Sequence, residues 1–109
     1  MIACTGQDAT AQALQNILAG DQCMTVFKDP NKEATALANA AIALLKGDKP
    51  ATTGTIKDSK TGRSVPAVLL SPEAITIKNI EDVITAKGQT VADVCKDKYA
   101  ALCTANGVK

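Results

Sequence analysis

Two charged residues, Asp8 and Lys28, have the types and the spacing expected of a site for a polar ligand. Asp8 follows a short apolar run at residues 2–5, and Lys28 ends a second apolar run that begins at Cys23. If the two runs are neighbouring parallel strands, both side chains project from the carboxyl edge of one sheet, where ligands of open α/β sheets bind. A carboxylate beside an ammonium suits a hydroxylated ligand. The structural alternative is that Asp8 caps the next helix and that Lys28 is solvated.

The segment between these two residues predicts the element that positions them. Ala11, Leu14 and Leu18 repeat at helical spacing until Gly20, which predicts a helix. The expected order is therefore a strand, a loop and this helix, followed by the second strand. A helix of this length is sufficient for a crossover, so the two strands are expected to be parallel neighbours in a right-handed βαβ unit.

A second helix is predicted to begin with Asp29 as its cap and Pro30 at its first position. Apolar residues at helical spacing predict a buried stripe that consists of Leu37, Ala41, Leu44 and Leu45. Residues 49–70 are rich in Thr, Gly, Ser and Pro, and two extended runs at 53–57 and 65–70 flank a polar turn. This pattern predicts a hairpin, with Pro66 at an edge or irregular position.

The remaining residues predict a strand and terminal helices after a boundary at Ser71-Pro72. Residues 75–77 alternate in polarity, Asn79 is expected to cap a short helix, and Thr90 with Asp93 resembles a capping box for a helical region through residue 102. The expected class is α/β, with a parallel-centred βαβ sheet, flanking helices, a hairpin and terminal helices. The predicted division is a core with hairpin at 1–70 and a crossover with terminal helices at 71–109, within one structural unit.

Composition excludes several classes of function. The chain has 109 residues, no histidine and a net charge of +1, and Phe27 and Tyr99 are its only aromatic residues. Mechanisms that need imidazole are therefore excluded, and nothing favours nucleic acid or an anionic membrane as a partner. The first residues resemble no signal peptide, so an exported protein would be present here in a mature, truncated or engineered form. An enzyme is the least favoured class, because no nucleophile has an orienting base.

Five segments occur in an order and spacing that carry a family resemblance: Thr5-Gly6-Gln7-Asp8-Ala9, Ile17-Leu18-Ala19-Gly20, 24–29, 65–72 and Ile77-Lys78-Asn79-Ile80. Together they resemble the C-terminal portion of periplasmic sugar-binding proteins of bacterial ABC importers, particularly the xylose and multiple-monosaccharide binders. The similarity covers nearly the whole chain.

The resemblance implies a two-lobed α/β fold whose cleft closes over one monosaccharide, with Asp8 and Lys28 bound to sugar hydroxyls. Gln7 is a further candidate for ligand binding, or it shapes the loop, whereas Asn39 and Arg63 are expected to be surface residues. The resemblance also implies a periplasmic or extracytoplasmic location and the membrane subunits of an ABC transporter as partners. No cofactor is implied.

The chain is too short to contain the family's amino-terminal lobe. It is therefore expected to be a fragment that carries half the ligand site, with the missing lobe or a second copy of the fragment as its partner. The alternative function is the effector-binding part of a LacI-type transcription regulator, which has a similar two-lobed architecture.

The four cysteines have spacings of 19, 72 and 8 residues, which do not suit a zinc site. Cys4, late in the first predicted strand, and Cys23, early in the second, are expected about 10 Å apart and buried as small hydrophobic residues. Cys95 and Cys103 can pair only if the helix between them breaks, because eight residues of straight helix rise about 12 Å. Lys96-Asp97-Lys98 offers such a break, and the bridge would suit an oxidising compartment. The alternative is two unpaired thiols on one helix.

Overall fold

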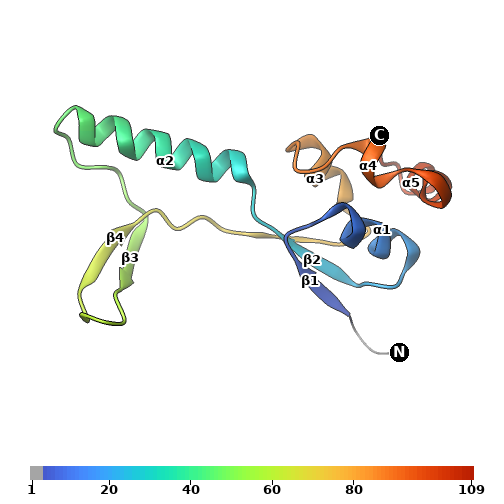
Figure 1. Ribbon diagram of the computed structural model, residues 1–109, viewed down its shortest axis with the longest axis horizontal. Coiled ribbons are helices and arrows are strands. Elements are labelled where there is room, and N and C mark those ends of the chain that lie inside the picture. Colours follow the sequence, from blue (N-terminus) through green and yellow to red (C-terminus); the bar gives the residue numbers. More distant parts are fainter. Residues whose placement is uncertain (1–3) are drawn as a thin grey trace. The chain divides into compact units, whose positions relative to one another are not determined.

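The computed structural model describes residues 4–109 (Figure 1). It contains a three-stranded mixed sheet. β1 (Thr5–Gln7) and β2 (Met24–Phe27) are parallel, and β2 pairs antiparallel with β5 (Glu73–Ile75). The strand order is β1-β2-β5, so the strand that ends next to Lys28 lies in the middle. The parallel pair confirms the predicted α/β class.

β1 begins later in the chain than the sequence predicted. The expected strand covered residues 2–5, of which 2 and 3 lie outside the described residues, and Gly6 was expected in a loop. Gly6 instead lies in the strand, where an added Cβ would come within 2.7 Å of the side-chain Nε2 of Gln22. This amide donates a 2.9 Å hydrogen bond to the Met24 carbonyl. A side chain at position 6 would therefore displace the Gln22 amide, so Gly6 is explained by a close approach and not by a turn.

The shift in β1 changes the environment of the first two cysteines. Cys4 directly precedes β1, Cys23 directly precedes β2, and the Cys23 N–H donates a 2.8 Å hydrogen bond to the Cys4 carbonyl. Both cysteines are exposed. The predictions that they lie about 10 Å apart and are buried are therefore wrong, because Cys4 lies just before its strand and not near the end of it.

The crossover helix α1 (Ala11–Ala19) agrees with its predicted range. Its cap is Thr10, whose hydroxyl accepts a 3.2 Å hydrogen bond from the Ala13 N–H. Gly20 ends the helix with a φ of 82°, a left-handed conformation that favours glycine. The structural alternative for Asp8, that it caps this helix, is therefore wrong.

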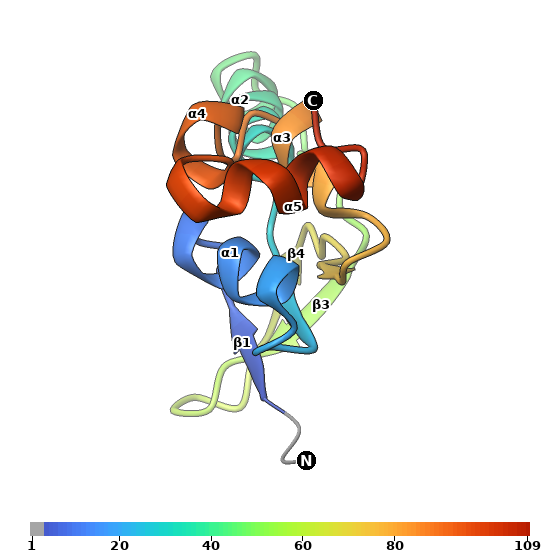
Figure 2. The ribbon, with the colours of Figure 1, turned by 90° about the vertical axis from the view of Figure 1, so that its right-hand side faces the viewer.

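Three short helices complete the first compact unit, which contains the residues up to Asp29 and Pro72–Lys109. They are α3 (Ile80–Thr85), α4 (Val91–Val94) and α5 (Ala100–Ala105). α4 and α5 contact α1 (Figure 2). The side-chain amide of Gln15 in α1 donates to the carbonyls of Asp93 and Val94, both at 3.1 Å, and so satisfies two groups at the end of α4. The largest fully buried residues are Leu14, Thr25, Ile75, Ile80, Val83 and Val94.

The predicted terminal helix is interrupted at the expected place. A 3₁₀ turn over Asp97–Tyr99 separates α4 from α5, and Asp97 has a positive φ of 51°. Cys95 and Cys103 form a disulfide across this break, with a Cα–Cα distance of 5.7 Å. Of the two predicted capping residues, only Thr90 forms a side-chain cap. Its hydroxyl accepts a hydrogen bond from the Asp93 N–H at 3.1 Å, whereas the side chain of Asn79 makes no capping hydrogen bond to α3.

The second compact unit is Pro30–Ser71 and contains α2 (Pro30–Leu45) and the hairpin of β3 (Gly54–Lys57) and β4 (Ser64–Ala67). The hairpin and the position of Pro30 agree with the sequence analysis. The chain returns to the first unit after Ser71, at the predicted boundary, but it leaves the first unit already after Asp29. Residues 1–70 are therefore not one continuous unit in the structure.

The predicted buried stripe of α2 is wrong, because α2 contains no buried residue. Leu37, Leu44 and Leu45 are 72, 64 and 88% exposed. The spacing of apolar residues predicts which side of a helix can be buried, but burial needs a partner layer, and unit 2 contains none over this side. None of the helices within residues 4–109 combines the length and the apolarity that crossing a membrane requires.

Candidate functional site

Asp8 and Lys28 lie together at the carboxyl edge of the parallel strands, as the sequence predicted. Asp8 directly follows β1 and Lys28 directly follows β2, and Lys28 Nζ lies 2.9 Å from Asp8 Oδ1. The side chains of Lys28 and Asp8 remain 44 and 63% exposed. Both functional groups are therefore accessible to a ligand while they hold each other in place.

The backbone under this ion pair is in an unfavourable conformation. Asp8 and Ala9 have φ values of 80° and 43°, in the left-handed region that residues other than glycine rarely adopt. An exposed ion pair contributes only about 0–1 kcal/mol to stability, whereas each such residue costs on the order of 1 kcal/mol. The turn is therefore not explained by stability, and turns of this kind are concentrated at functional sites.

Two hydrogen bonds hold the turn against β2. The Asp8 N–H donates to the Val26 carbonyl at 2.8 Å, and the Ala9 N–H donates to the hydroxyl of Thr25 at 3.3 Å. Thr25 is fully buried, so its hydroxyl faces no competition from solvent. Thr25 was not predicted from the sequence as a residue that positions the turn. The available signal was a hydroxyl side chain within an otherwise apolar β-strand.

Two further polar residues lie at this edge. Gln7 is the last residue of β1 and is exposed beside Asp8, as expected for a further candidate. Glu73 begins β5 opposite Phe27, which places it next to the carboxyl end of β2, and its Oε1 accepts a 3.1 Å hydrogen bond from Asn79 Nδ2. Glu73 was missed because only the antiparallel pairing of β5 brings it to this edge.

This edge presents a carboxylate, an ammonium and an amide within a few residues of two strand ends. The carboxylate accepts hydrogen bonds, the ammonium donates them and the amide does both. A hydroxyl group of a ligand both donates and accepts, so it can form a hydrogen bond with each of the three. The arrangement suits a neutral ligand with several hydroxyl groups. The remaining polar candidates, Asn39 and Arg63, belong to the second unit and are exposed, in agreement with the surface roles expected for them.

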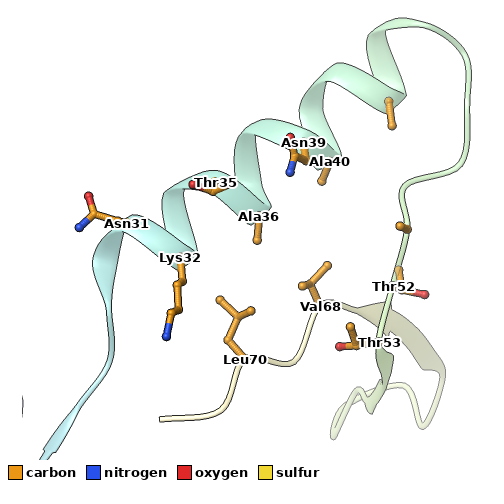
Figure 3. Close-up of a pocket in the computed structure, with 12 residues that line it drawn as sticks. Asn31, Lys32, Thr35, Ala36, Asn39, Ala40, Thr52, Thr53, Val68 and Leu70 are labelled. Atoms are coloured by element: carbon orange, nitrogen blue, oxygen red, sulfur yellow. The ribbon is translucent and has the colours of Figure 1, made fainter. Parts of the chain in front are cut away.

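The second unit contains a different kind of concavity, with a volume of about 700 Å³ (Figure 3). It lies between α2 and the segments around the hairpin, and Ala36, Val68 and Leu70 point into it. Its rim carries polar groups such as Asn39 and Thr53. Methyl groups dominate its centre, so the cleft suits apolar packing better than binding of a polyhydroxylated ligand.

Comparison with known proteins shows which proteins the chain is similar to. No protein-family model matches the chain. A crystal structure of a carbohydrate transporter solute-binding protein from Chloroflexus aurantiacus, in complex with D-glucose, superposes with a TM-score of 0.72 and 34% identity over 82% of this chain and 26% of that one. An ABC transporter solute-binding protein from Clostridium phytofermentans with bound β-D-glucose gives 0.75 and 25%, over 84% of this chain and 29% of that one.

Curated relatives agree with the structural comparison. The multiple sugar-binding periplasmic receptor ChvE of Rhizobium radiobacter is 35% identical over 92 residues, which are 84% of this chain and 26% of the receptor. The D-xylose-binding periplasmic protein of Haemophilus influenzae is 34% identical over 87 residues, which are 80% of this chain and 26% of that protein. The chain therefore spans about a quarter of the relatives it matches. These similarities confirm the resemblance to periplasmic sugar-binding proteins of ABC transporters.

Proposed function

We propose that the chain is part of the periplasmic solute-binding component of an ABC sugar importer, and that the edge with Asp8 and Lys28 supplies half of its monosaccharide site. The observation that carries the proposal is the exposed ion pair on a strained turn, in a chain whose named relatives bind sugars. These relatives also favour the importer over a LacI-type regulator.

Binding in this proposal is reversible and involves no catalysis. One sugar hydroxyl donates a hydrogen bond to the Asp8 carboxylate, and a second sugar oxygen accepts one from the Lys28 ammonium. The ion pair orients both groups before the ligand arrives, and the Thr25 hydroxyl holds the turn. Gln7 adds a contact from the same edge.

The other half of the site is assigned to the missing amino-terminal lobe. The supporting observation is the apolar surface of unit 2, where Leu37, Leu44 and Leu45 are exposed and the cleft beside α2 is lined with methyl groups. A stable monomer rarely leaves such a surface uncovered. A second copy of this chain is the alternative cover, and the membrane subunits of the transporter are further partners of the whole protein.

Half a site binds weakly. With one face of the sugar in water, each hydrogen bond replaces one to solvent and contributes at most about 0.5–1.5 kcal/mol. A few such bonds do not exceed the loss of translational and rotational freedom, which is roughly 4 kcal/mol or more. We therefore expect the 109-residue chain to bind a pentose or hexose with a Kd in the millimolar range or weaker.

The test is an NMR titration of the ¹⁵N-labelled chain with D-glucose and D-xylose. We expect fast-exchange shifts at the amides of Asp8, Ala9 and Lys28, and their loss in the Asp8→Asn and Lys28→Met variants. Asp21→Asn and Lys78→Met are matched controls, because both side chains are exposed in loops at the opposite, amino end of β2. They should leave the titration unchanged.

Two results would contradict the proposal. Shifts confined to other residues would remove the sugar from this edge. Micromolar binding to the monomer would mean that the chain carries a complete site, whereas micromolar binding only by a dimer would mean that a second copy replaces the missing lobe.

A further inference from the structure

We propose that Cys4 and Cys23 form a second disulfide, which joins the amino ends of β1 and β2. The two residues belong neither to the edge with Asp8 and Lys28 nor to the Cys95–Cys103 bridge. The proposal rests on their adjacency in the sheet and on their exposure, and it does not depend on sugar binding.

The backbone places the two cysteines within the range of a disulfide. In the parallel register Thr5 pairs with Met24, so Cys4 and Cys23 are the next residues on the amino side of each strand. Neighbouring strands lie about 4.8 Å apart. The 2.8 Å hydrogen bond from the Cys23 N–H to the Cys4 carbonyl holds their α-carbons within about 7 Å at most. Disulfides need a Cα–Cα distance of roughly 4.4–6.8 Å.

Access favours this pair as well. Both thiols are free and exposed, so an oxidant reaches them without unfolding the sheet. Within residues 4–109, the other two cysteines are already joined to each other, so neither competes for Cys4 or Cys23. Exported proteins retain few exposed free thiols in an oxidising compartment.

The chemistry is thiol–disulfide exchange with a small or protein disulfide as the oxidant. The thiolate of one cysteine attacks the oxidant's disulfide and displaces one thiolate, and the second cysteine then attacks the mixed disulfide and displaces the other. Two protons and two electrons leave the chain, one S–S bond forms, and the oxidant is released as two thiols.

The bridge would close the segment that contains β1 and α1. β1 has only three residues, so few ladder hydrogen bonds fix its register, and a slip of one residue would turn every side chain to the other face. A covalent link at the amino ends fixes the register directly. It therefore preserves the alignment of Asp8 with Lys28 at the opposite ends of the same strands.

The test is peptide mapping of the full chain after equilibration in a glutathione redox buffer, with alkylation under denaturing conditions. Cleavage before aspartate separates the peptide that ends at Gln7 from peptide 21–28, and separates 93–96 from 97–109. We expect two linked peptide pairs and no alkylated cysteine. The 93–96 and 97–109 pair is an internal control for oxidation.

Serine variants test whether the Cys4–Cys23 disulfide raises the melting temperature of the chain. Relative to the oxidised wild type, the Cys4→Ser, Cys23→Ser double variant should melt on the order of 10 °C lower, and the difference should vanish in a reducing buffer that also opens the control bridge. Alkylated Cys4 and Cys23 beside an intact Cys95–Cys103 pair would overturn the proposal. A Cys4–Cys4 dimer, or pairing of Cys4 with Cys103, would do so as well.

Discussion

The two compact units contain helices with similar local sequence patterns but opposite burial. In unit 1, Leu14 of α1 is fully buried, whereas in unit 2 Leu44 of α2 is 64% exposed. Every residue of the buried core belongs to unit 1, and no described residue of unit 2 is buried. The spacing of apolar residues therefore predicts which side of a helix can be buried, and the neighbouring elements decide whether that side is buried.

This difference also separates the roles of the two units. Unit 1 has its own core, a disulfide and the polar edge with Asp8 and Lys28, so it has the parts that hold a site rigid. Unit 2 exposes apolar residues on a helix and on a hairpin, which is typical of a surface that another layer covers.

The largest expected effect comes from matched truncations in the two helices. Leu14→Ala should lower the free energy of unfolding by about 2–5 kcal/mol, because it leaves a cavity in the core. Leu44→Ala should change it by less than about 0.5 kcal/mol, since its side chain is already mostly in water. Urea unfolding monitored by far-UV circular dichroism, which reports on the helices of both units, measures both. Equal losses would mean that α2 has a buried face in solution.

A second, smaller effect is expected from the disulfide of unit 1. Replacing both Cys95 and Cys103 by serine should cost about 2–3 kcal/mol, because the bridge restricts the unfolded chain and ties α4 to α5. The amide signals of β3 and β4 in an NMR spectrum should stay at their wild-type positions, since these strands belong to unit 2. Displaced hairpin signals would show that the two units are coupled.

The smallest effect is a pH response confined to the hairpin turn. Hydrogen bonds from the Thr61 hydroxyl and the Lys60 N–H to the carboxylate lower the pKa of Asp58 below its ordinary value of 3.8. The stabilisation that these two hydrogen bonds give the turn is therefore fully present at pH values above 3.8, and it is lost as the pH falls through the lowered pKa of Asp58. The Lys60 amide shift should titrate with a midpoint below 3.8, and this titration should be absent in Asp58→Asn. A midpoint above 3.8 in the wild type would contradict it.

Much of the fold followed from local patterns. The helix that ends at Gly20, the start of α2 at Pro30 and the hairpin around Asp58 each depend on nearby residues with defined conformational preferences, and the structure contains all three. The juxtaposition of Asp8 and Lys28 also followed from the sequence, because parallel strands place both ends at one edge. Their role toward a ligand stays a prediction.

The sequence by itself determined the βαβ order, the hairpin and the polar residues at two strand ends, because propensity, capping and spacing act over a few residues. Only the tertiary structure decided the register that brings Cys4 beside Cys23, the antiparallel pairing that brings Glu73 to the edge with Asp8 and Lys28, and the exposure of α2. Pairing and burial depend on segments far apart in the chain, and no local pattern specifies which surfaces meet.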